Sequence, residues 1–320
     1  MNDFDTLVVV IPDDFLRLKR HYIRLSANLP GQLFFVGPKE LGALVSGLVS
    51  EADDSSTSSR IRWIDENSLL SFDAVYSYLA DRMTDMLKGR ELPRKVAGWY
   101  YQQFLKMNYA LTCSDKYYMV WDGDTVPCKK VEMFKAENGK PYFDLKNECH
   151  ELYFETLGKL FPGMGKVIRQ SFISEHMLFD AAIMRELIKD IEENDSLPGS
   201  LFWEKILSAI PADKIQESAF SEFETYGTFT ALRYMNAYAL RKWHSFRLAG
   251  EFFDPDTICE RDFEWLSKDF DAISFEKGHF VREDHKNLFD NPAYQEKLSA
   301  RQMLESIQDL FNGGYVESWS

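Results

Sequence analysis

The first part of the chain alternates between short apolar runs and longer stretches in which apolar residues recur every three or four positions. Residues 6–11 (TLVVVI) and 32–36 (QLFFV) predict strands buried on both faces, and residues 60–64 (RIRWI) predict a third strand. Apolar stripes of helical spacing over 15–25 and 41–48 predict helices between these strands. Strands that alternate with helices in this way favour a parallel sheet flanked by helices.

A fourth strand carries the most informative local pattern. An Asp/Ser-rich loop is expected over 51–59 and helices over 68–87 and 94–112, and then residues 117–121 (YYMVW) predict a buried strand. This strand leads directly into Asp122-Gly123-Asp124. Ligands of parallel α/β sheets bind at the carboxyl ends of the strands. The two aspartates therefore follow a strand at the end where a ligand is expected.

Beyond residue 130 the pattern is less regular and mainly helical. The expected elements are a hairpin over 131–145, a strand over 167–174, helices over 175–193, 201–210, 220–243 and 260–268, a strand over 272–275, and a last amphipathic helix over 294–311. There is no internal repeat and no linker. We predict one continuous α/β domain, with a Rossmann-type, mostly parallel sheet flanked by helices and a mainly helical C-terminal elaboration.

Composition and charge narrow the classes of partner. Apolar residues make up 45% of the chain and charged residues 28%, which excludes a mainly disordered protein. The 37 Lys and Arg against 51 Asp and Glu give a net charge of −14, so a nucleic-acid backbone is not an expected partner. No apolar run approaches the roughly 20 residues of a membrane-spanning helix, and the chain starts with acidic residues. We expect a cytoplasmic protein with four reduced cysteines.

The Asp122-Gly123-Asp124 segment suggests cation chemistry. Carboxylates two residues apart in a strand face opposite ways, but a turn at Gly123 can bring both toward one hard cation such as Mg²⁺ or Mn²⁺. A cation held there can bind a diphosphate. The same three residues also occur in ordinary solvated turns, so the pattern alone leaves both interpretations open.

The sequence around the turn fits two enzyme families. The stretch WDGDTV matches the DxDx[TV] pattern of haloacid-dehalogenase-type phosphatases, with Asp122 as the nucleophile. That family carries its motif on the first strand, whereas three predicted strands precede Asp122 here, and no GDxxxD-like stretch follows. The phosphatase is therefore the second interpretation. A non-catalytic sugar-binding protein is a third.

Three blocks give the first interpretation. Residues 98–107 (GWYYQQFLKM), 120–127 (VWDGDTVP) and 221–227 (SEFETYG) resemble bacterial GT-A-like nucleotide-sugar glycosyltransferases of a poorly characterised, DxD-containing family. The resemblance implies a metal-dependent transferase with a UDP-sugar as the favoured donor, Mn²⁺ or Mg²⁺, and a carbohydrate or lipid-linked acceptor used in surface polysaccharide synthesis. It also implies that residues 1–130 form the donor half and residues 131–320 the acceptor half of the domain.

The helix expected over 94–112 supplies several donor-binding candidates. Its buried stripe is Val96, Tyr100, Phe104, Met107 and Leu111, which leaves Trp99, Gln102, Gln103 and Lys106 on the other faces. The Lys106 ammonium suits a phosphate, and an amide such as that of Gln102 or Gln103 both donates to and accepts from sugar hydroxyls. Without the resemblance, an ordinary surface face is the more frequent explanation of these residues.

The block at 221–227 supplies the catalytic candidates. Ser221 can cap a helix, with Glu224 in the capping-box position, so that Glu222 is the freer carboxylate. The resemblance implies that Glu222, or secondarily Glu224, is the general base. Tyr226 is a candidate to line the sugar pocket, although an aromatic residue in a helix is more often part of the core.

The remaining candidates come from position along the chain. Asp14 and the pair Asp65-Glu66 follow the first and third strands, where base or ribose binds in this fold, although helix capping explains them nearly as well. His279 is a candidate metal ligand together with Asp122 and Asp124. His176 is a candidate acceptor contact at a helix start, and a surface or capping role explains it about as well. The last helix is expected to pack on the core, with peripheral membrane contact as the alternative.

Overall fold

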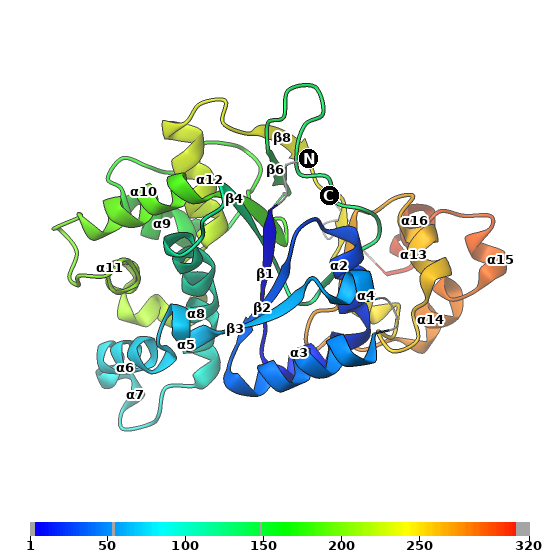
Figure 1. Ribbon diagram of the computed structural model, residues 1–320, viewed down its shortest axis with the longest axis horizontal. Helices are drawn as coiled ribbons and strands as arrows, with labels where there is room; N and C mark the ends of the chain where they lie inside the picture. Colours follow the sequence, from blue (N-terminus) through cyan, green and yellow to red (C-terminus); the bar gives the residue numbers. More distant parts are fainter. Residues whose placement is uncertain (1–3, 53–54, 148, 312–320) are drawn as a thin grey trace.

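The computed structural model describes residues 4–52, 55–147 and 149–311 (Figure 1). Its centre is a five-stranded sheet in the order β3-β2-β1-β4-β7. The strands are β1 (Asp5–Val9), β2 (Leu33–Gly37), β3 (Ile61–Asp65), β4 (Tyr117–Trp121) and β7 (His176–Asp180). The pairs β3–β2, β2–β1 and β1–β4 are parallel, and only β7 runs antiparallel to its neighbour in this sheet. The predicted mostly parallel sheet is therefore confirmed.

The strands β2, β1 and β4 are buried on both faces of the sheet, which explains their continuous apolar runs, whereas the edge strand β3 is partly exposed. Because side chains alternate along a strand, Leu7 of β1 joins one core and Val8 joins the other, and Tyr118 and Met119 of β4 divide in the same way. We call these the first core and the second core. A strand that is buried on both faces does not alternate between apolar and polar residues, so a continuous apolar run in the sequence predicts it directly.

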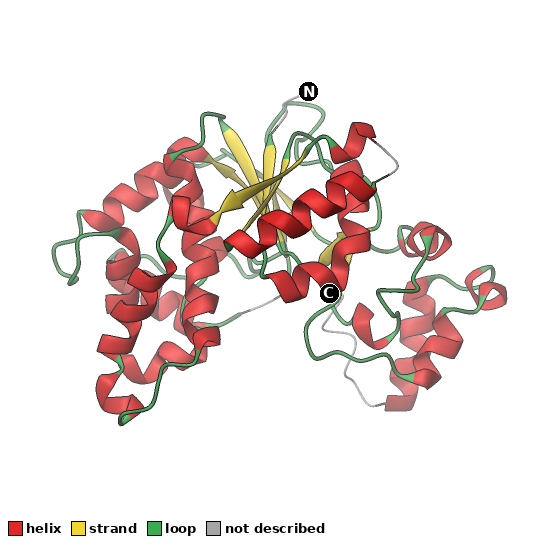
Figure 2. Cartoon of the chain, turned by 60° about the horizontal axis from the view of Figure 1, so that its bottom comes forward, coloured by secondary structure: helices red, strands yellow, loops and turns green. Residues whose placement is uncertain are grey.

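Helices cover both faces of the sheet. The first core packs against α6 (Phe72–Arg82), α8 (Arg94–Asn108), α9 (Glu151–Leu160), α10 (Ala181–Glu192), α11 (Phe202–Ala209) and α12 (Glu222–Arg233). The second core packs against α1 (Pro12–Leu18), α2 (Tyr22–Asn28), α3 (Lys39–Glu51), α13 (Glu260–Leu266), α14 (Glu283–Phe289) and α16 (Ala300–Phe311). Figure 2 shows the strands in the centre, with helices on both sides.

Shorter elements connect these layers. They are η1 (Lys19–His21), α4 (Ser55–Ser58), α5 (Glu66–Leu69), α7 (Thr84–Leu87), η2 (Tyr109–Leu111), η3 (Ala212–Glu217), η4 (Ala249–Glu251) and α15 (Pro292–Gln295). No helix in the described ranges combines the length and the apolar character that a bilayer crossing requires. The last helix, α16, buries Met303, Leu304 and Ile307 in the second core, as the packing interpretation predicted.

Two small sheets bring distant parts of the chain to the end of β4. Strand β10 (Ala272–Ser274) pairs antiparallel with β5 (Thr125–Pro127) and parallel with β9 (Ser245–Phe246). Strands β6 (Tyr142–Leu145) and β8 (Ala239–Lys242) form a separate parallel pair. The backbone N–H of Phe275 donates to the Asp124 carbonyl at 2.8 Å. The C-terminal third therefore lies directly beside the Asp122-Gly123-Asp124 turn.

The strand expected over 167–174 and the helix expected from 175 are both displaced. The strand is β7, starting at His176, and the helix α10 starts at Ala181. Glu175 has a left-handed backbone with φ of 61°, which neither a strand nor a helix uses, so the regular strand begins one residue later. Tertiary pairing of β7 with β4 decides the outcome, because the local apolar pattern permits either segment to be the strand.

Other expected helices are shorter or divided. The helix expected over 220–243 ends at Arg233, and the chain turns through Asn236, which has φ of 69°, into β8. The helix expected over 68–87 is divided into α5, α6 and α7, because Ser71 caps a new helix by accepting a hydrogen bond from Ala74 N. The expected loop over 51–59 includes the short helix α4, and the last expected helix is divided into α15 and α16.

Candidate functional site

The Asp122-Gly123-Asp124 turn is held tightly against the first strand. A Cβ atom at position 123 would lie 3.2 Å from the Val8 side chain and 3.3 Å from that of Val10. These β-branched side chains have little rotamer freedom to move away. The Tyr22 hydroxyl also donates to the Gly123 carbonyl at 3.1 Å. Glycine is therefore needed here for close packing, and the turn has a fixed position at the carboxyl end of β4.

Asp122 is anchored from behind by a buried lysine. The Lys106 Nζ atom of α8 lies 2.8 Å from Asp122 Oδ1 and 2.8 Å from Glu222 Oε1. The Lys106 and Glu222 side chains are 5% and 4% exposed, whereas that of Asp122 is 34% exposed. The three charged groups therefore form a chain from the interior to the surface, with Asp122 at its open end.

One cation between two carboxylates leaves a surplus negative charge. Asp122 and Glu222 raise the pKa of Lys106 despite its burial, so the lysine stays charged. Burial raises the pKa of Glu222 more strongly than Lys106 lowers it. The surplus negative charge is therefore least stable on the buried Glu222. Asp122 is partly in contact with water and is the carboxylate of the group that a ligand can reach.

Asp124 lies in a similarly acidic environment. Burial, together with the charges of Asp122 and Glu276, raises the pKa of Asp124 to about 7. A hydrogen bond from Thr125 and the charge of Arg247 oppose this rise. Asp124 is therefore about half protonated near neutral pH and mostly protonated below it, unless a positive charge arrives beside it.

Glu175 is a buried residue that sequence reasoning missed. Its carbonyl oxygen accepts from Asp122 N at 2.8 Å, and its carboxylate lies 2.8 Å from Lys146 Nζ. Trp243 and Ser245 also donate to this carboxylate, each at 3.0 Å. Glu175 thus fixes the backbone of the turn, while its own charge is neutralised inside the protein. A charged residue directly before the buried strand β7 was a signal, but periodicity does not show its partners.

A second missed group links the network to Asp124. Arg247 Nε lies 2.7 Å from Glu276 Oε1 and 4.0 Å from Glu175 Oε1. Glu276 follows Phe275, whose backbone is bonded to that of Asp124. Both ends of the turn are therefore connected to buried or half-buried charges from parts of the chain more than 50 residues away.

The predicted residues Asp14 and Asp65 lie at the same edge of the sheet as the turn, because β1, β3 and β4 are parallel. Asp14 in the first turn of α1 lies 3.7 Å from Arg17 and 3.8 Å from Lys277. Asp65 caps α5 by accepting from Asn67 N at 3.0 Å, as the capping alternative predicted.

Glu66 is the second residue of the predicted pair Asp65-Glu66. Burial raises its pKa to about 7, with help from Asp65 and Glu40 and against the effect of Arg94. On α8, Trp99 and Gln102 are partly exposed. At the carboxyl edge of the sheet, Glu66 therefore adds a carboxylate that is easily protonated.

One predicted donor contact, Gln103, and one predicted general base, Glu224, serve instead to hold α12 in place. The Gln103 side-chain oxygen accepts from Glu222 N at 3.1 Å, and Gln103 is buried, although the sequence predicted an outer face for it. Glu224 Oε1 accepts from the Ser171 hydroxyl and from Phe172 N. The Glu224 side chain faces the interior in this structure, so it does not meet a substrate.

Two predicted acceptor contacts are also internal. His176 lies within β7 rather than at a helix start, and its Nε2 atom is 2.9 Å from Asp144 Oδ2, with both side chains at most 1% exposed. The Tyr226 hydroxyl accepts from Asp180 N at 2.8 Å and bonds to Tyr238. Neither side chain reaches solvent, so we assign both to the core.

His279 lies in the segment after β10. Its Nδ1 atom is buried and has no hydrogen-bond partner among the described residues. Within the described ranges, no group of three or more His, Cys, Asp or Glu side chains converges to hold a metal ion. Among the described residues, the structure therefore brings neither His279 nor another such side chain together with both aspartates to complete a metal site.

The fold and the site together define an α/β protein with paired carboxylates at the carboxyl edge of a mostly parallel sheet. The chain belongs to a family of unknown function, DUF6492, whose model matches residues 3–314. A search among curated proteins gives no match.

Several solved structures resemble the chain in fold. Mouse xyloside xylosyltransferase 1, in its apo form, is 12% identical with a TM-score of 0.45, over 88% of this chain and 100% of that chain. An active-site mutant of LgtC is 10% identical with a TM-score of 0.41, over 92% and 100%. The glycosyltransferase GlyE of Streptococcus pneumoniae TIGR4 is 8% identical with a TM-score of 0.39, over 97% and 64%.

Proposed function

We propose that this protein is a glycosyltransferase that moves a sugar from a nucleoside-diphosphate donor, with a UDP-sugar favoured, to a carbohydrate or lipid-linked acceptor in surface polysaccharide synthesis. The observation that carries the proposal is the aspartate pair on a fixed turn at the carboxyl end of a central parallel strand. Asp122 offers a partly exposed carboxylate, and Asp124 has a pKa of about 7. Burial and the neighbouring carboxylates both disfavour the charged form of Asp124, and a cation beside the pair would stabilise that form.

The residues present fit Mg²⁺ or Mn²⁺. Both ions prefer oxygen ligands, and Mg²⁺ is commonly held by one or two carboxylates together with substrate phosphates. The carboxylates near the turn are Asp122, Asp124, Glu222 and Glu276, and the cations that meet them are Lys106 and Arg247. A divalent ion on Asp122 and Asp124 would relieve this imbalance and, when bound, would neutralise charge on the departing nucleoside diphosphate.

We assign Lys106 and Glu222 to positioning. Lys106 is surrounded by two carboxylates and is almost fully buried, so it is not free to bind a phosphate. Glu222, at 4% exposure, acts on Asp122 through Lys106 rather than on an acceptor hydroxyl. Together they fix the Oδ1 atom of Asp122 and leave the other oxygen for a ligand. The proposed donor contacts are then Asp14, Asp65, Trp99 and Gln102.

The test is donor turnover. With Mn²⁺ and a panel of nucleotide-sugars, the wild-type protein should release the nucleoside diphosphate from one donor, and Asp124→Asn should reduce the rate by at least about 100-fold. Asp81→Asn, on the exposed surface of α6, is the matched control and should keep the wild-type rate. Cleavage of a generic phosphomonoester that depends on Asp122 would support a phosphatase instead. Binding of a sugar without any donor turnover would support a non-catalytic protein.

A further inference from the structure

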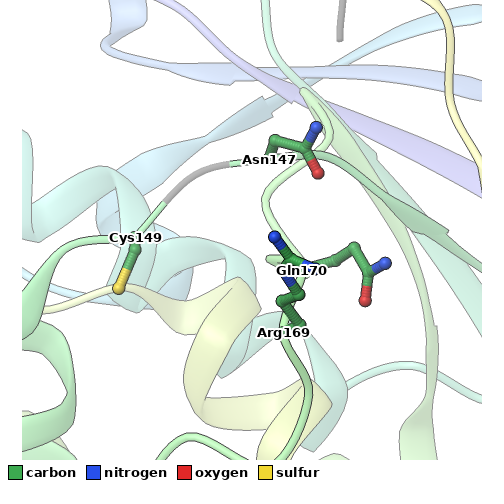
Figure 3. Close-up of a pocket in the computed structure, with 4 residues that line it drawn as sticks. All are labelled: Asn147, Cys149, Arg169 and Gln170. Atoms are coloured by element: carbon green, nitrogen blue, oxygen red, sulfur yellow. The ribbon is translucent and has the colours of Figure 1, made fainter.

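Polar groups outside the aspartate turn gather in a hollow after β6 and at the end of β3. The hollow has a volume of about 520 Å³ and is lined by Asn147, Cys149, Arg169 and Gln170, as Figure 3 shows. Residue 148, between two of these residues in the chain, lies outside the described ranges, so we assign no ligand to the hollow. The residues at the end of β3 are all described, and one of them is a buried carboxyl group without a partner.

This residue is Glu66, the first residue of α5. It is 8% exposed, and no described residue donates a hydrogen bond to its carboxyl group or forms an ion pair with it. The carboxyl oxygens are not fully enclosed. Buried polar groups nearly always have a hydrogen-bond partner, and one without a partner requires an explanation. A ligand at the surface beside Glu66 would supply that partner.

The charges around Glu66 define the kind of ligand. Burial raises the pKa of Glu66 to about 7, Asp65 and Glu40 add to this rise, and Arg94 of α8 opposes it. Tyr101, also on α8, interacts electrostatically with Glu66. An anionic ligand would be repelled by Asp65 and Glu40, whereas a neutral ligand would not. A protonated carboxyl group offers such a ligand one donor and one acceptor side by side.

The face of α8 that carries Arg94 and Tyr101 is open at Gly98. Arg94 lies four residues before Gly98 and Tyr101 three residues after it, so the three share one face of the helix. A Cβ atom at Gly98 would meet no neighbouring group within 4 Å. Glycine is unfavourable inside a helix, but it permits a ligand to approach the backbone closely. Because α5 packs against α8, as Figure 1 shows, this open face adjoins Glu66.

The same face of α8 leads to the aspartate turn. Gln102 and Lys106 follow Gly98 at intervals of four residues, and Lys106 binds Asp122. The distance from Gly98 to Lys106 is about 12 Å along the helix axis. Across the sheet, three strand spacings separate β4 from β3, which is about 14 Å. A nucleoside diphosphate with its phosphates at the turn is long enough to place its base beside Glu66.

We propose that Glu66, with its carboxyl group protonated, binds the base of the donor nucleotide, and that the open face at Gly98 provides the space for this base. The Glu66 O–H group donates to a ring carbonyl, and its other oxygen accepts from the adjacent ring N–H. Uracil offers this pair of groups as its O4 atom and its N3–H group. The role in donor binding rests on the proposed function, whereas the binding of a nucleoside at Glu66 does not.

The test uses nucleosides without phosphate or metal, so that it does not depend on the aspartate turn. Saturation-transfer-difference NMR measures the affinity of uridine and of N3-methyluridine, which lacks the N3–H donor. Near about pH 6, uridine should bind at least about tenfold more tightly than N3-methyluridine. Ionisation of Glu66 removes the O–H donor, so the affinity of uridine should fall by about tenfold between about pH 6 and pH 8.

Variants identify the groups responsible. Glu66→Gln keeps a donor beside an acceptor, so it should retain the affinity for uridine and lose its pH dependence. Glu66→Leu should lower that affinity by at least about tenfold near about pH 6 and remove the distinction from N3-methyluridine. Glu296→Gln, the matched control, changes an exposed carboxylate after α15 and should leave the affinity and its pH dependence unchanged.

Gly98→Leu tests the open face separately. The leucine side chain should occupy the space of the base and lower the affinity for uridine by at least about tenfold. The midpoint of urea unfolding should not fall, because leucine is more favourable than glycine inside a helix. A loss of affinity in this variant is then a local effect.

Four results would each overturn the proposal: equal affinity for the two nucleosides, an affinity for uridine that does not change with pH, a pH dependence that persists in Glu66→Gln, or unchanged binding in Gly98→Leu. Selective binding of uridine without turnover of any nucleotide-sugar would refute the proposed function and keep the base site. Donor turnover without selective binding of uridine would keep the proposed function and refute the base site.

Discussion

The buried charges around Lys106 give the most specific prediction for stability. The substitution Lys106→Met keeps the length of the side chain and removes the positive charge between Asp122 and Glu222. Glu222 then remains as a buried carboxylate without its cation. Asp122, which is partly exposed, is compensated by water. The decrease in the free energy of unfolding therefore comes mainly from the unpaired Glu222 carboxylate.

The expected magnitude follows from the burial of the pair. Removing one partner from a buried ion pair costs about 3–5 kcal/mol, because the remaining charge is uncompensated. That is a large part of the roughly 5–15 kcal/mol by which a domain is stable. The second substitution Glu222→Gln removes the stranded charge, so the double variant Lys106→Met/Glu222→Gln should recover most of the loss.

The loss should also depend on pH. Without Lys106 the pKa of Glu222 rises further above its unfolded value, so the folded protein binds the proton more tightly than the unfolded chain does. A carboxyl group whose pKa is higher in the folded than in the unfolded protein stabilises the folded state at pH values below its unfolded pKa, and this contribution is lost as the pH rises. The difference between Lys106→Met and wild type should therefore be larger near about pH 8 than near about pH 5.

Urea unfolding followed by tryptophan fluorescence measures these differences, since the chain contains 7 Trp residues. The double-variant cycle at two pH values gives the coupling between Lys106 and Glu222. A loss that does not change with pH, or that Glu222→Gln does not restore, would show that Lys106 does not compensate Glu222 in solution.

Three further predictions follow from single positions. Gly123→Ala should weaken Mn²⁺-dependent UDP binding by at least about tenfold in calorimetry, because its Cβ would meet Val8 and Val10, and unchanged binding would contradict the packing described for the turn. Because Asp124 has a pKa of about 7, a proton competes with the cation for its carboxylate. The affinity for Mn²⁺ should therefore rise by about tenfold per pH unit below pH 7 and level off above it. An affinity that does not change between about pH 5 and 7 would contradict that pKa. Glu66→Gln should stabilise the protein near about pH 8, by at most about 3 kcal/mol, and should have little effect at about pH 4. The reason is that the raised pKa of Glu66 lowers the free energy of unfolding only at pH values where this carboxyl is ionised in the unfolded chain. Denaturant unfolding at both pH values tests this.

The sheet could be predicted because its strands β2, β1 and β4 are buried on both faces. The runs at 6–11, 32–36 and 117–121 contain the apolar residues that fill the two cores, and no local alternative competes with a strand there. The strand β7 was misplaced because the stretch before it is also partly apolar. Its position depends on pairing with β4 and on the left-handed Glu175, which are tertiary features.

The candidate site could be predicted only in part. The aspartate pair was recognisable because it directly follows a buried strand. Lys106 was expected on an outer face, because its spacing places it off the apolar stripe of α8, yet it is buried. Its partners Asp122 and Glu222 lie 16 and 116 residues away in the chain, so no local pattern shows that its charge is compensated. Conversely, Leu111 belonged to the expected buried stripe and is 51% exposed, because α8 ends at Asn108.

The central claim is that Asp122 and Asp124 hold a divalent cation that binds a nucleoside diphosphate. Electron paramagnetic resonance of Mn²⁺ measures this directly, because the signal of the free ion decreases when it binds. With UDP and the wild-type protein, the signal should fall in a saturable manner at one ion per chain, and Asp122→Asn and Asp124→Asn should each remove this effect while the protein stays folded. Equal loss of the Mn²⁺ signal in the wild type and in both variants would contradict the account.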